Sequence, residues 1–288
     1  GEMHRLAKIV RPNTVIMTNI GCCHLENLID RDGILKAKTE IFDFLESDAH
    51  IILNGDDDKL ATITDVRGIK PVTFGFAPER DIWADELKSL GLKGTACHFH
   101  TPVGDFHATV GMPGRHMVAN ALAGTAVGLA YGLTLDQIKT GIEANESLSG
   151  RFNIIDTDRY TIIDDCYNAN PQSVTAALEV LGRTDCERRV AVLGDMGELG
   201  DLTDQAHFNA GALAAMLGID FVIAIGSKAA RIADGAAMSG GDVVHFATKE
   251  AALQTVKEQL QPHTSMLIKA SHAMRFDSLV EELKKTYD

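Results

Sequence analysis

Long hydrophobic runs are missing from the 288-residue sequence. No apolar stretch approaches the ~18 residues that a membrane span needs, and no signal-peptide pattern opens the chain. Excess positive charge is missing too: 27 Lys and Arg face 40 Asp and Glu, a formal net charge of −13. This balance argues against a general nucleic-acid binder. It leaves an anionic small-molecule substrate open, because a few basic side chains and helix N-termini are enough to bind one.

Cysteine is scarce, and its spacing has no metal-binding or disulfide pattern. The five cysteines are Cys22, Cys23, Cys97, Cys166 and Cys186. None forms a CxxC pair or another metal-ligand spacing. We therefore expect free structural thiols in a reduced, cytoplasmic setting, with a reactive cysteine as the alternative.

The common nucleotide and hydrolase motifs are also absent. The sequence contains no GxxxxGK(S/T), no GxGxxG and no GxSxG. No phosphate-cradling glycine loop can therefore be located within these residues.

The pattern of apolar residues predicts an α/β protein with two domains. At this length one or two domains are expected, each able to bury a core. The segment from Glu146 to Arg151 contains two serines and a glycine and is the best linker. We place the domains at 1–148 and 149–288.

The first domain is organised around the stretch from Thr18 to Phe42. It follows a β-branched run at 14–17, which reads as a buried parallel strand. His24 and Glu26 come just past the carboxyl end of that strand, where open α/β sheets bind ligands. A predicted helix from Asp32 to Ser47 carries Lys36 and Lys38, so an imidazole, a carboxylate and two amines gather near one sheet edge.

The next elements are a strand at 51–53, a turn at 54–58 and a helix at 59–64, followed by a strand near 72–74. The turn from Asn54 to Asp58 could hold a metal ion through its carboxylates. We prefer an Asx turn that caps the following helix.

An antiparallel hairpin is predicted at 96–110, followed by helices at 117–131 and 134–145. Thr134 and Gln137 form a capping-box pattern at the start of the second helix. His98 and His100 share one strand face, and His107 lies across the turn. These histidines could bind a metal, but no Cys or carboxylate completes the group, so we prefer solvent-facing strand histidines.

The second domain alternates strand and helix regularly and predicts a five- or six-stranded, mostly parallel sheet covered by helices. The strands are expected at 160–163, 189–193, 221–225, 243–246 and 266–269, and the helices at 172–181, 204–216, 228–236, 249–260 and 276–286.

Three turns of this domain carry polar side chains where strands end. In the first, Asn170 and Pro171 suit a helix N-terminus, while Asp165 and Asn168 are surplus to that cap and could bind a ligand. The second, at 193–200, holds Asp195 and Glu198 among three glycines; substrate contact and turn geometry explain it equally well. The third, at 225–228, is a strand–glycine–helix junction able to bind an anion.

Seven blocks, in order and at matching spacing, resemble the Mur ligase family. They are TNIGCCHLE (18–26), AKTEIF (37–42), PGRHMVANALA (113–123), SGRF (149–152), IDDCYNANPQS (163–173), LGDMGELG (193–200) and KASHAMRFDSLV (269–280). Each block alone is a weak signal, but the ordered set covers nearly the whole chain. The blocks at 163–173 and 193–200 resemble the branch that adds a D-alanyl-D-alanine dipeptide.

The resemblance implies an incomplete central ATPase domain followed by a Rossmann-like C-terminal domain. It implies an ATP-dependent ligase of peptidoglycan precursor synthesis that joins D-alanyl-D-alanine to a UDP-N-acetylmuramoyl tripeptide through an acyl phosphate. Magnesium would neutralise charge on the phosphoryl oxygens. A monomer without nucleic-acid partners or membrane insertion is expected.

The resemblance also implies roles for individual residues. His24 matches a metal ligand, and Lys38 matches a lysine that is carbamylated and then binds metal. Asn120 matches an adenine contact, Arg151 an arginine that reaches the γ-phosphate, and Asp165 a ribose or nucleotide contact. The residues expected to face nucleotide and dipeptide are Tyr167, Asn168, Asn170, Asp195 and Glu198. A solvated lysine and a turn histidine remain the simpler readings of Lys38 and His24.

The sequence departs from the family pattern in lacking the phosphate-binding loop. We therefore expect a truncated form that is inactive or severely impaired in ligation on its own. Two other classes stay open: a non-catalytic Mur-like binding module, and an amide ligase of the folate polyglutamate or cyanophycin type.

Overall fold

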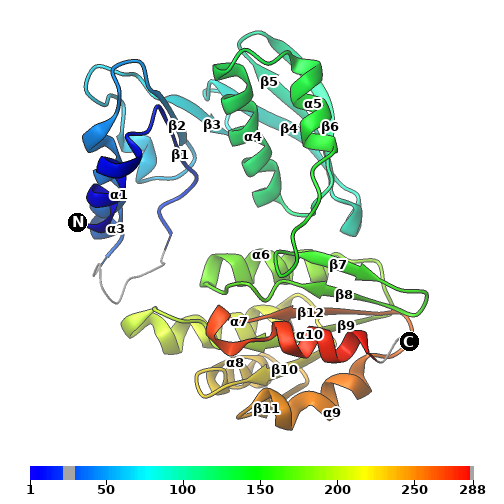
Figure 1. The fold of residues 1–288 in the computed structure, drawn as a ribbon. Coiled ribbons are helices and arrows are strands. Elements are labelled where there is room, and N and C mark those ends of the chain that lie inside the picture. Colours follow the sequence, from blue (N-terminus) through cyan, green and yellow to red (C-terminus); the bar gives the residue numbers. More distant parts are fainter. Residues whose placement is uncertain (22–29, 286–288) are drawn as a thin grey trace. The chain divides into compact units, whose positions relative to one another are not determined.

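The chain divides into two compact units, Gly1–Glu146 (unit 1) and Ser147–Asp288 (unit 2) (Figure 1). The computed structural model describes residues 1–21 and 30–285. The division falls at the start of the serine- and glycine-containing segment 146–151. Within the described residues each unit has one six-stranded sheet, and both sheets are mostly parallel, as the predicted α/β class requires. No described helix is both long and apolar enough to cross a membrane.

The sheet of unit 1 runs in the order β1-β2-β3-β4-β5-β6. Its strands are β1 (Thr14–Met17), β2 (His50–Asn54), β3 (Val72–Gly75), β4 (Ile82–Ser89), β5 (Thr95–Thr101) and β6 (Gly104–Val110). Strands β1 to β4 pair in parallel, and β4, β5 and β6 pair antiparallel. Its α-helices are α1 (Glu2–Val10), α3 (Arg31–Thr39), α4 (Arg115–Ala130) and α5 (Leu135–Glu143), and 3-10 turns lie at Glu40–Phe44, Leu60–Thr62 and Gly91–Lys93.

Two hydrophobic clusters can be followed among the described residues of unit 1. In the first, Ile51 and Leu53 of β2 pack with Ile34 of α3. In the second, Phe74 of β3 and Phe99 of β5 pack with Leu122 of α4. Ile52, between Ile51 and Leu53 on β2, belongs to the second cluster, so the two clusters lie on opposite faces of this strand.

Two helices of unit 1 are shorter than the sequence predicts. The helix expected at 32–47 ends at Thr39, whose hydroxyl donates to the Lys36 carbonyl at 3.0 Å, and a 3-10 turn follows that buries Phe42. The helix expected at 59–64 is only a 3-10 turn. The Asx turn before it is confirmed: the Asp56 N–H donates to Asn54 Oδ1 at 2.9 Å, and Asp57 Oδ1 accepts from the following turn.

Strand β4, which pairs with β5, was not predicted along with the hairpin at 96–110. Its residues alternate between the core and the outer face until a bulge between Asp85 and Lys88, where Glu86 adopts a left-handed φ of 51°. The bulge interrupts the two-residue period that marks a strand in sequence. Because Asp85 and Glu86 lie beside His98, the expectation that no carboxylate completes the histidine group is wrong.

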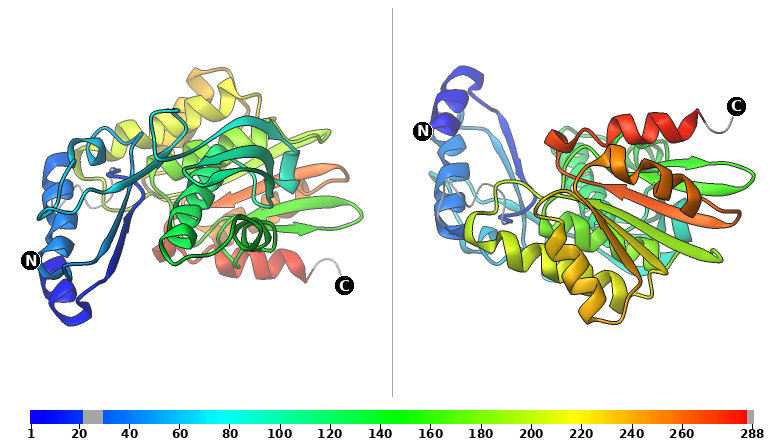
Figure 2. Two further views of the ribbon diagram at one scale, coloured as in Figure 1. Left: turned by 90° about the horizontal axis from the view of Figure 1, so that it is seen from above. Right: turned by 90° about the horizontal axis from the view of Figure 1, so that it is seen from below.

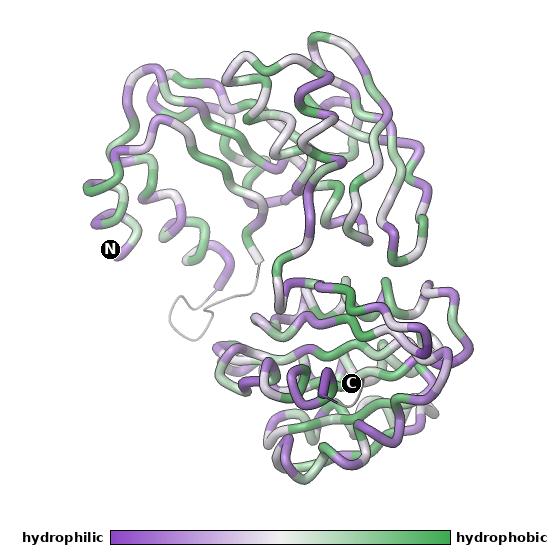
Figure 3. The backbone as a smooth tube through the Cα atoms, turned by 45° about the vertical axis from the view of Figure 1, so that its right-hand side comes forward, coloured by the Kyte–Doolittle hydropathy of each residue, from purple (hydrophilic) through white to green (hydrophobic). Residues whose placement is uncertain are grey.

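The sheet of unit 2 runs in the order β11-β10-β9-β12-β8-β7. Its strands are β7 (Asn153–Asp156), β8 (Tyr160–Asp164), β9 (Arg188–Gly194), β10 (Phe221–Ile225), β11 (Val243–Phe246) and β12 (Thr264–Lys269). All pairs are parallel except β7 with β8, which confirms the mostly parallel sheet. Hydrophobic residues follow its inner strands (Figure 3), as expected of strands covered on both faces.

Helices cover both faces of this sheet. They are α6 (Pro171–Gly182), α7 (Thr203–Met216), α8 (Ala230–Met238), α9 (Lys249–Gln259) and α10 (Asp277–Lys284), and 3-10 turns lie at Gly200–Leu202 and His272–Met274. Helices α9 and α10 pack on one face, and α6, α7 and α8 lie on the other (Figure 2, right).

This layering creates a switch point between two neighbouring strands. The chain leaves β9 toward α7 on one face, and leaves the adjacent β12 toward α10 on the opposite face. In doubly wound sheets ligands bind outside the carboxyl ends of strands at such a point. The loops after β8, β9 and β12 are therefore the natural place for a site in unit 2.

Candidate functional site

Two consecutive carboxylates end strand β8 and hold the start of unit 2. Asp164 Oδ2 accepts a hydrogen bond from the Gly150 N–H at 2.9 Å, and Asp165 Oδ1 accepts one from the Phe152 N–H at 3.1 Å. Arg151, between these two anchored residues, is exposed. The carboxylates thus fix the backbone on both sides of the predicted γ-phosphate arginine.

Lys269, the last residue of β12, joins the same group. Its side chain is 2% exposed, and Nζ lies 2.6 Å from Asp165 Oδ2 and donates to the Asn168 carbonyl at 2.9 Å. Burial raises the pKa of the Asp165 carboxyl, although the Lys269 ammonium opposes that shift. Lys269 is not among the predicted site residues, although the sequence from Lys269 to Arg275 indicates basic groups at this edge of the sheet.

Arg151 stacks on the exposed ring of Tyr167. The guanidinium carbon lies 3.9 Å from the ring centroid, and the Tyr167 N–H donates to the Gly150 carbonyl at 2.9 Å. His272, on the loop after β12, lies 5.5 Å from the same ring. A cation held over an aromatic face at a sheet edge is ready to meet an anion from solvent.

Asn170 is committed to its helix. Its Oδ1 accepts from the Ser173 N–H at 2.8 Å, and Ser173 Oγ accepts from the Asn170 N–H at 3.1 Å. This capping box, with Pro171 at the first helical position, confirms the predicted cap. Asn168 instead turns its Oδ1 to the Ala169 N–H at 2.9 Å.

Asp195 occupies the strand–glycine–helix junction at 225–228, which the sequence predicts as an anion-binding position. Its Oδ1 accepts from the Lys228 N–H at 3.0 Å and the Ala229 N–H at 2.7 Å. Gly226 makes this possible, because a Cβ there would lie 2.3 Å from the same oxygen, and its φ is +122°. The anion at this strand–glycine–helix junction is therefore the carboxylate of the chain itself.

His207 supports the loop at 193–200, which contains Asp195. It is fully buried; Nε2 accepts from the Met196 N–H at 2.9 Å, and Nδ1 donates to the Thr203 carbonyl at 2.6 Å. Burial lowers the pKa of this imidazole. Glu198, farther along the loop, is exposed with a left-handed φ of 60°.

In unit 1, considered by itself, Lys38 lies at the carboxyl end of β1. Its Nζ donates to the Asn19 carbonyl at 3.1 Å, so the amine reaches the loop that follows the strand. Asn54, at the end of the neighbouring β2, donates to the Thr18 carbonyl at 2.9 Å. His24, Glu26 and the pair Cys22-Cys23 lie outside the described residues.

Asn120 lies at a cavity of about 290 Å³ beside helices α4 and α5. The amide side chains of Gln137 and Asn145 also line it, and its other walls are Val110, Met112, Met117, Ala121, Gly124, Gly128, Leu133, Ile138, Gly141 and Ile142. A mostly apolar cavity with a few amides suits a flat heterocycle that needs both burial and hydrogen bonds.

Three of the five cysteines lie within the described residues. Cys97, Cys166 and Cys186 are free. Burial raises the pKa of Cys97 to about 11 and that of Cys166 still further, and Cys166 Sγ donates to Asp164 Oδ1 at 2.9 Å. Thiols that resist ionisation are poor nucleophiles and poor metal ligands, which fits a structural role.

Known proteins match the chain along nearly its whole length. Residues 1–128 match the Mur ligase middle domain, and residues 150–272 match the Mur ligase, glutamate ligase domain. The UDP-N-acetylmuramoyl-tripeptide–D-alanyl-D-alanine ligase of Escherichia coli K12 is 33% identical over 99% of this chain and 63% of the relative. The ligase of the same name from Bacillus subtilis 168 is 32% identical over 98% of the chain and 62% of its own length.

The fold comparison agrees. A crystal structure of MurF from Acinetobacter baumannii superimposes with a TM-score of 0.88 at 32% identity, covering 98% of this chain and 62% of that one. The chain therefore spans a little under two thirds of the relatives that it matches. Both of its units have a counterpart in one and the same family: the chain belongs to the Mur ligase family.

Proposed function

We propose that the protein is an ATP-dependent ligase that joins D-alanyl-D-alanine to a UDP-N-acetylmuramoyl tripeptide. The observation that carries the proposal is the 33% identity, over 99% of the chain, to a ligase named for that reaction. Because the chain spans 63% of that relative, the activity is proposed for the product of the complete reading frame that encodes it.

The proposed chemistry has two steps. The γ-phosphoryl group of ATP passes to the terminal carboxylate of the tripeptide, and the amine of the dipeptide then attacks the acyl carbon and expels phosphate. The first step places negative charge on the transferred group, so a positioned guanidinium lowers its barrier. Arg151 is proposed for this role, since its neighbours Gly150 and Phe152 are tied to Asp164 and Asp165.

The cavity beside Asn120 supports ATP as the nucleotide. Its volume of about 290 Å³ is near the lower end of ordinary ligand pockets and suits a base rather than a whole nucleotide. Adenine offers both hydrogen-bond donors and acceptors at its edge, and the amide groups of Asn120 and Asn145 can pair with both, whereas Gln137 Oε1 already accepts from the Thr134 N–H. We propose that unit 1 holds the base here.

The described residues do not by themselves form a magnesium site near Lys38. As an amine Lys38 donates to the Asn19 carbonyl, whereas magnesium needs oxygen acceptors. Carbamylation would remove the positive charge and add two acceptor oxygens to Nζ, which keeps one N–H; His24, the other expected ligand, lies outside the described residues. We keep magnesium and the carbamate as part of the proposal and assign no step to them.

The remaining site residues fall into two groups. Tyr167 and Glu198 are exposed and are proposed to contact nucleotide or dipeptide directly. Asn170 and Asp195 are engaged with backbone N–H groups, so we propose that they act by holding their loops. Asp165 and Asn168, joined through Lys269, are proposed to face the ribose.

The test is a phosphate-release assay on the product of the complete reading frame. Release should require ATP, the UDP-linked tripeptide and D-alanyl-D-alanine together. Arg151→Ala should lower kcat by at least about 10²-fold, the scale of losing one charge-stabilising donor. Arg159→Ala, an exposed arginine in the same unit, is the matched control and should keep normal turnover.

Other outcomes would identify the alternatives. Turnover only with glutamyl or aspartyl substrates would replace this proposal by the folate polyglutamate or cyanophycin type. Nucleotide binding without any turnover would favour a Mur-like binding module. The 288-residue chain alone contains no phosphate-binding loop motif, so its dipeptide-dependent phosphate release should not exceed that of its Lys38→Ala variant.

Binding of adenine nucleotide can be tested separately on the 288-residue chain. Asn120→Ala should weaken ADP binding about tenfold in calorimetry, the value of one good hydrogen bond. Asn209→Ala, an exposed asparagine on α7, should leave it unchanged. Equal ADP affinities for the wild type, Asn120→Ala and Asn209→Ala would show that adenine does not bind in this cavity.

A further inference from the structure

The outer face of strands β4, β5 and β6 carries a cluster of imidazoles and carboxylates that the ligase proposal does not use. Core and outer residues alternate along these strands, so the core side holds Ala84, Phe99 and Ala108. The strand register aligns the outer residues in two rows across the sheet. The rows are Asp85–His98–His107 and Trp83–His100–Asp105.

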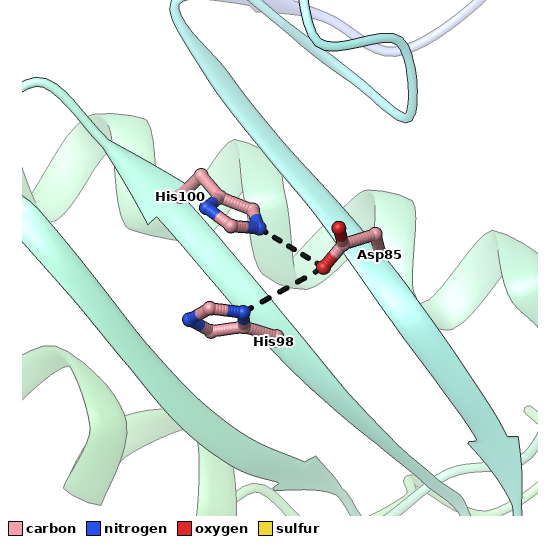
Figure 4. A group of neighbouring side chains, drawn as sticks. All are labelled: Asp85, His98 and His100. Carbon is pink, nitrogen blue, oxygen red and sulfur yellow. Dashed lines mark hydrogen bonds and ion pairs between the residues drawn. The ribbon is translucent and has the colours of Figure 1, made fainter.

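Three of these side chains converge on one point (Figure 4). Asp85 Oδ1 lies 2.9 Å from His100 Nε2 and 3.7 Å from His98 Nδ1, between the two rings. The ligand atoms of Asp85, His98 and His100 all lie within 4.8 Å of one another. Two nitrogens and one oxygen from two strands therefore face a common centre.

Their spacing fits a small tetrahedral ion. Zinc binds imidazole nitrogen and carboxylate oxygen at about 2.0–2.2 Å, which puts neighbouring ligand atoms about 3.3 Å apart. The two contacts of Asp85, at 2.9 and 3.7 Å, bracket that value, so small side-chain rotations would suffice. Imidazole-rich sets select zinc, nickel, copper or cobalt over magnesium and calcium, which prefer oxygen.

The surroundings of His100 resemble the second shell of a metal ligand. While Nε2 faces Asp85, Nδ1 lies 3.4 Å from Asp105 Oδ2, so a carboxylate is placed to fix the ring and its tautomer. Trp83 stacks on the same ring with centroids 3.8 Å apart and planes 11° apart. Both contacts hold the imidazole in the orientation that points Nε2 at the common centre.

The neighbouring ring of His98 is held in a similar way. It stacks on His107 with centroids 4.1 Å apart. The bulge at Glu86 turns a second carboxylate to this side, where its oxygen lies within 4.8 Å of nitrogens of His98 and His107. Bulges commonly re-aim a side chain at a functional position, and a left-handed glutamate is strained, so the local backbone carries an energetic cost.

We propose that Asp85, His98 and His100 bind a divalent transition-metal ion of the zinc type. The ion would join β4 to β5 on the outer face of unit 1. The side chains of Asp85, His98 and His100 are 45%, 22% and 18% exposed, so the fourth position faces solvent. The proposal is independent of the ligase activity and stands on unit 1 alone.

The test is a titration of the tag-free 288-residue chain with zinc, followed by calorimetry, and with cobalt(II), followed by visible absorption. We expect one zinc equivalent at this site and the intense d–d bands of tetrahedral cobalt without a thiolate charge-transfer band. Asp85→Asn, His98→Gln and His100→Gln should each weaken zinc binding at least about tenfold, the least expected when a ligand is lost.

His50→Gln, at the exposed first residue of β2, is the matched control and should keep the wild-type affinity. His107→Gln, which removes the stacking contact of His98 and none of the three ligands, should weaken zinc binding less than His98→Gln does. Zinc should raise the melting temperature of the wild type and of His50→Gln, and should raise that of His100→Gln less.

Three results would overturn the assignment. Unchanged affinity in His98→Gln and His100→Gln would leave only a cluster of ion pairs. A thiolate-to-cobalt band would place the ion at a cysteine. Loss of binding in His107→Gln would exclude Asp85, His98 and His100 as the complete ligand set.

Discussion

The polar clusters of the two units differ in what their side chains are engaged with. In unit 2, Asp165 accepts hydrogen bonds from Lys269 and the Phe152 N–H, and Lys269 also donates to the Asn168 carbonyl. Asp195 accepts hydrogen bonds from two backbone N–H groups before α8. In unit 1, His98 and His100 lie in the middle of a strand and face a carboxylate and solvent. The first arrangement builds loops of fixed shape, and the second leaves exchangeable ligand atoms. The comparison predicts that mutations will mainly reduce stability in unit 2 and ion binding in unit 1.

Lys269→Met should give the largest effect. The change leaves Asp165 and the Asn168 carbonyl without the buried ammonium that they share, and breaking a buried pair by removing one partner costs about 3–5 kcal/mol. Amide hydrogen exchange of β8, β9 and β12 measures this loss within unit 2.

The matched control is Lys284→Met, at an exposed ion pair on α10, which should leave exchange unchanged. Adding Asp165→Asn to Lys269→Met should recover part of the loss, because the unpaired charge is gone. Equal exchange rates in Lys269→Met and Lys284→Met would mean that the Asp165–Lys269 pair stabilises unit 2 no more than a surface ion pair does.

Gly226→Ala should cost about 2–4 kcal/mol of unit 2 stability. It combines a left-handed backbone penalty of about 1–2 kcal/mol with displacement of Asp195, whose capping is worth about 1–2 kcal/mol. Gly240→Ala has φ +81° but open space around its Cβ, so it should show the backbone penalty alone. The difference between the two variants in urea unfolding measures the role of Asp195; no difference would mean that Asp195 does not hold the start of α8.

Acid should destabilise unit 2 through His207. Because its folded pKa lies below the ordinary 6.5, the unfolded chain binds more protons as pH falls through 6.5. Stability is then lost at up to about 1.4 kcal/mol per pH unit until the folded pKa is reached. Protonation also removes the acceptor of the Met196 N–H. Between pH 7.5 and about pH 5, the free energy of unfolding measured in urea should fall more steeply with decreasing pH for the wild type than for His207→Gln. Equal slopes for the two proteins would contradict this.

Glu86→Gly should have the smallest effect and the opposite sign. Glycine accepts the φ of 51° without the strain of a side chain, so unit 1 should change between neutral and about 1 kcal/mol more stable. Lys88→Gly, on the same strand beyond the bulge, should instead lose about 0.5–1 kcal/mol. Zinc affinity should be unchanged in Glu86→Gly, since Glu86 is not among the three proposed ligands; a weaker affinity would bring Glu86 into the set.

Local sequence signals predicted local structure well. The runs at 190–193 and 221–225 lie in buried strands bounded by turns, and Asn170-Pro171 has the capping chemistry that the structure shows. The pairing of Asp165 with Lys269 could not be predicted in this way, because 104 residues separate them and only the strand order brings β8 next to β12.

The carboxylate beside the histidines was missed for a related reason. The hairpin pattern revealed His98 and His100, but Asp85 comes from β4, where a bulge interrupts the alternation of the strand. Similarly, the helix expected at 32–47 was too long, since spacing of apolar residues does not show where an α-helix tightens into a 3-10 turn.

The most direct test of the proposed function follows one oxygen atom. The product of the complete reading frame is supplied with ATP, D-alanyl-D-alanine and a UDP-N-acetylmuramoyl tripeptide whose terminal carboxylate carries ¹⁸O, and the released phosphate is analysed by mass spectrometry. If ATP activates that carboxylate as an acyl phosphate, attack by the amine leaves one carboxylate oxygen on phosphorus. Released phosphate should then carry one ¹⁸O for each amide bond formed. Phosphate without the label, released while the amide forms, would contradict the acyl-phosphate ligase.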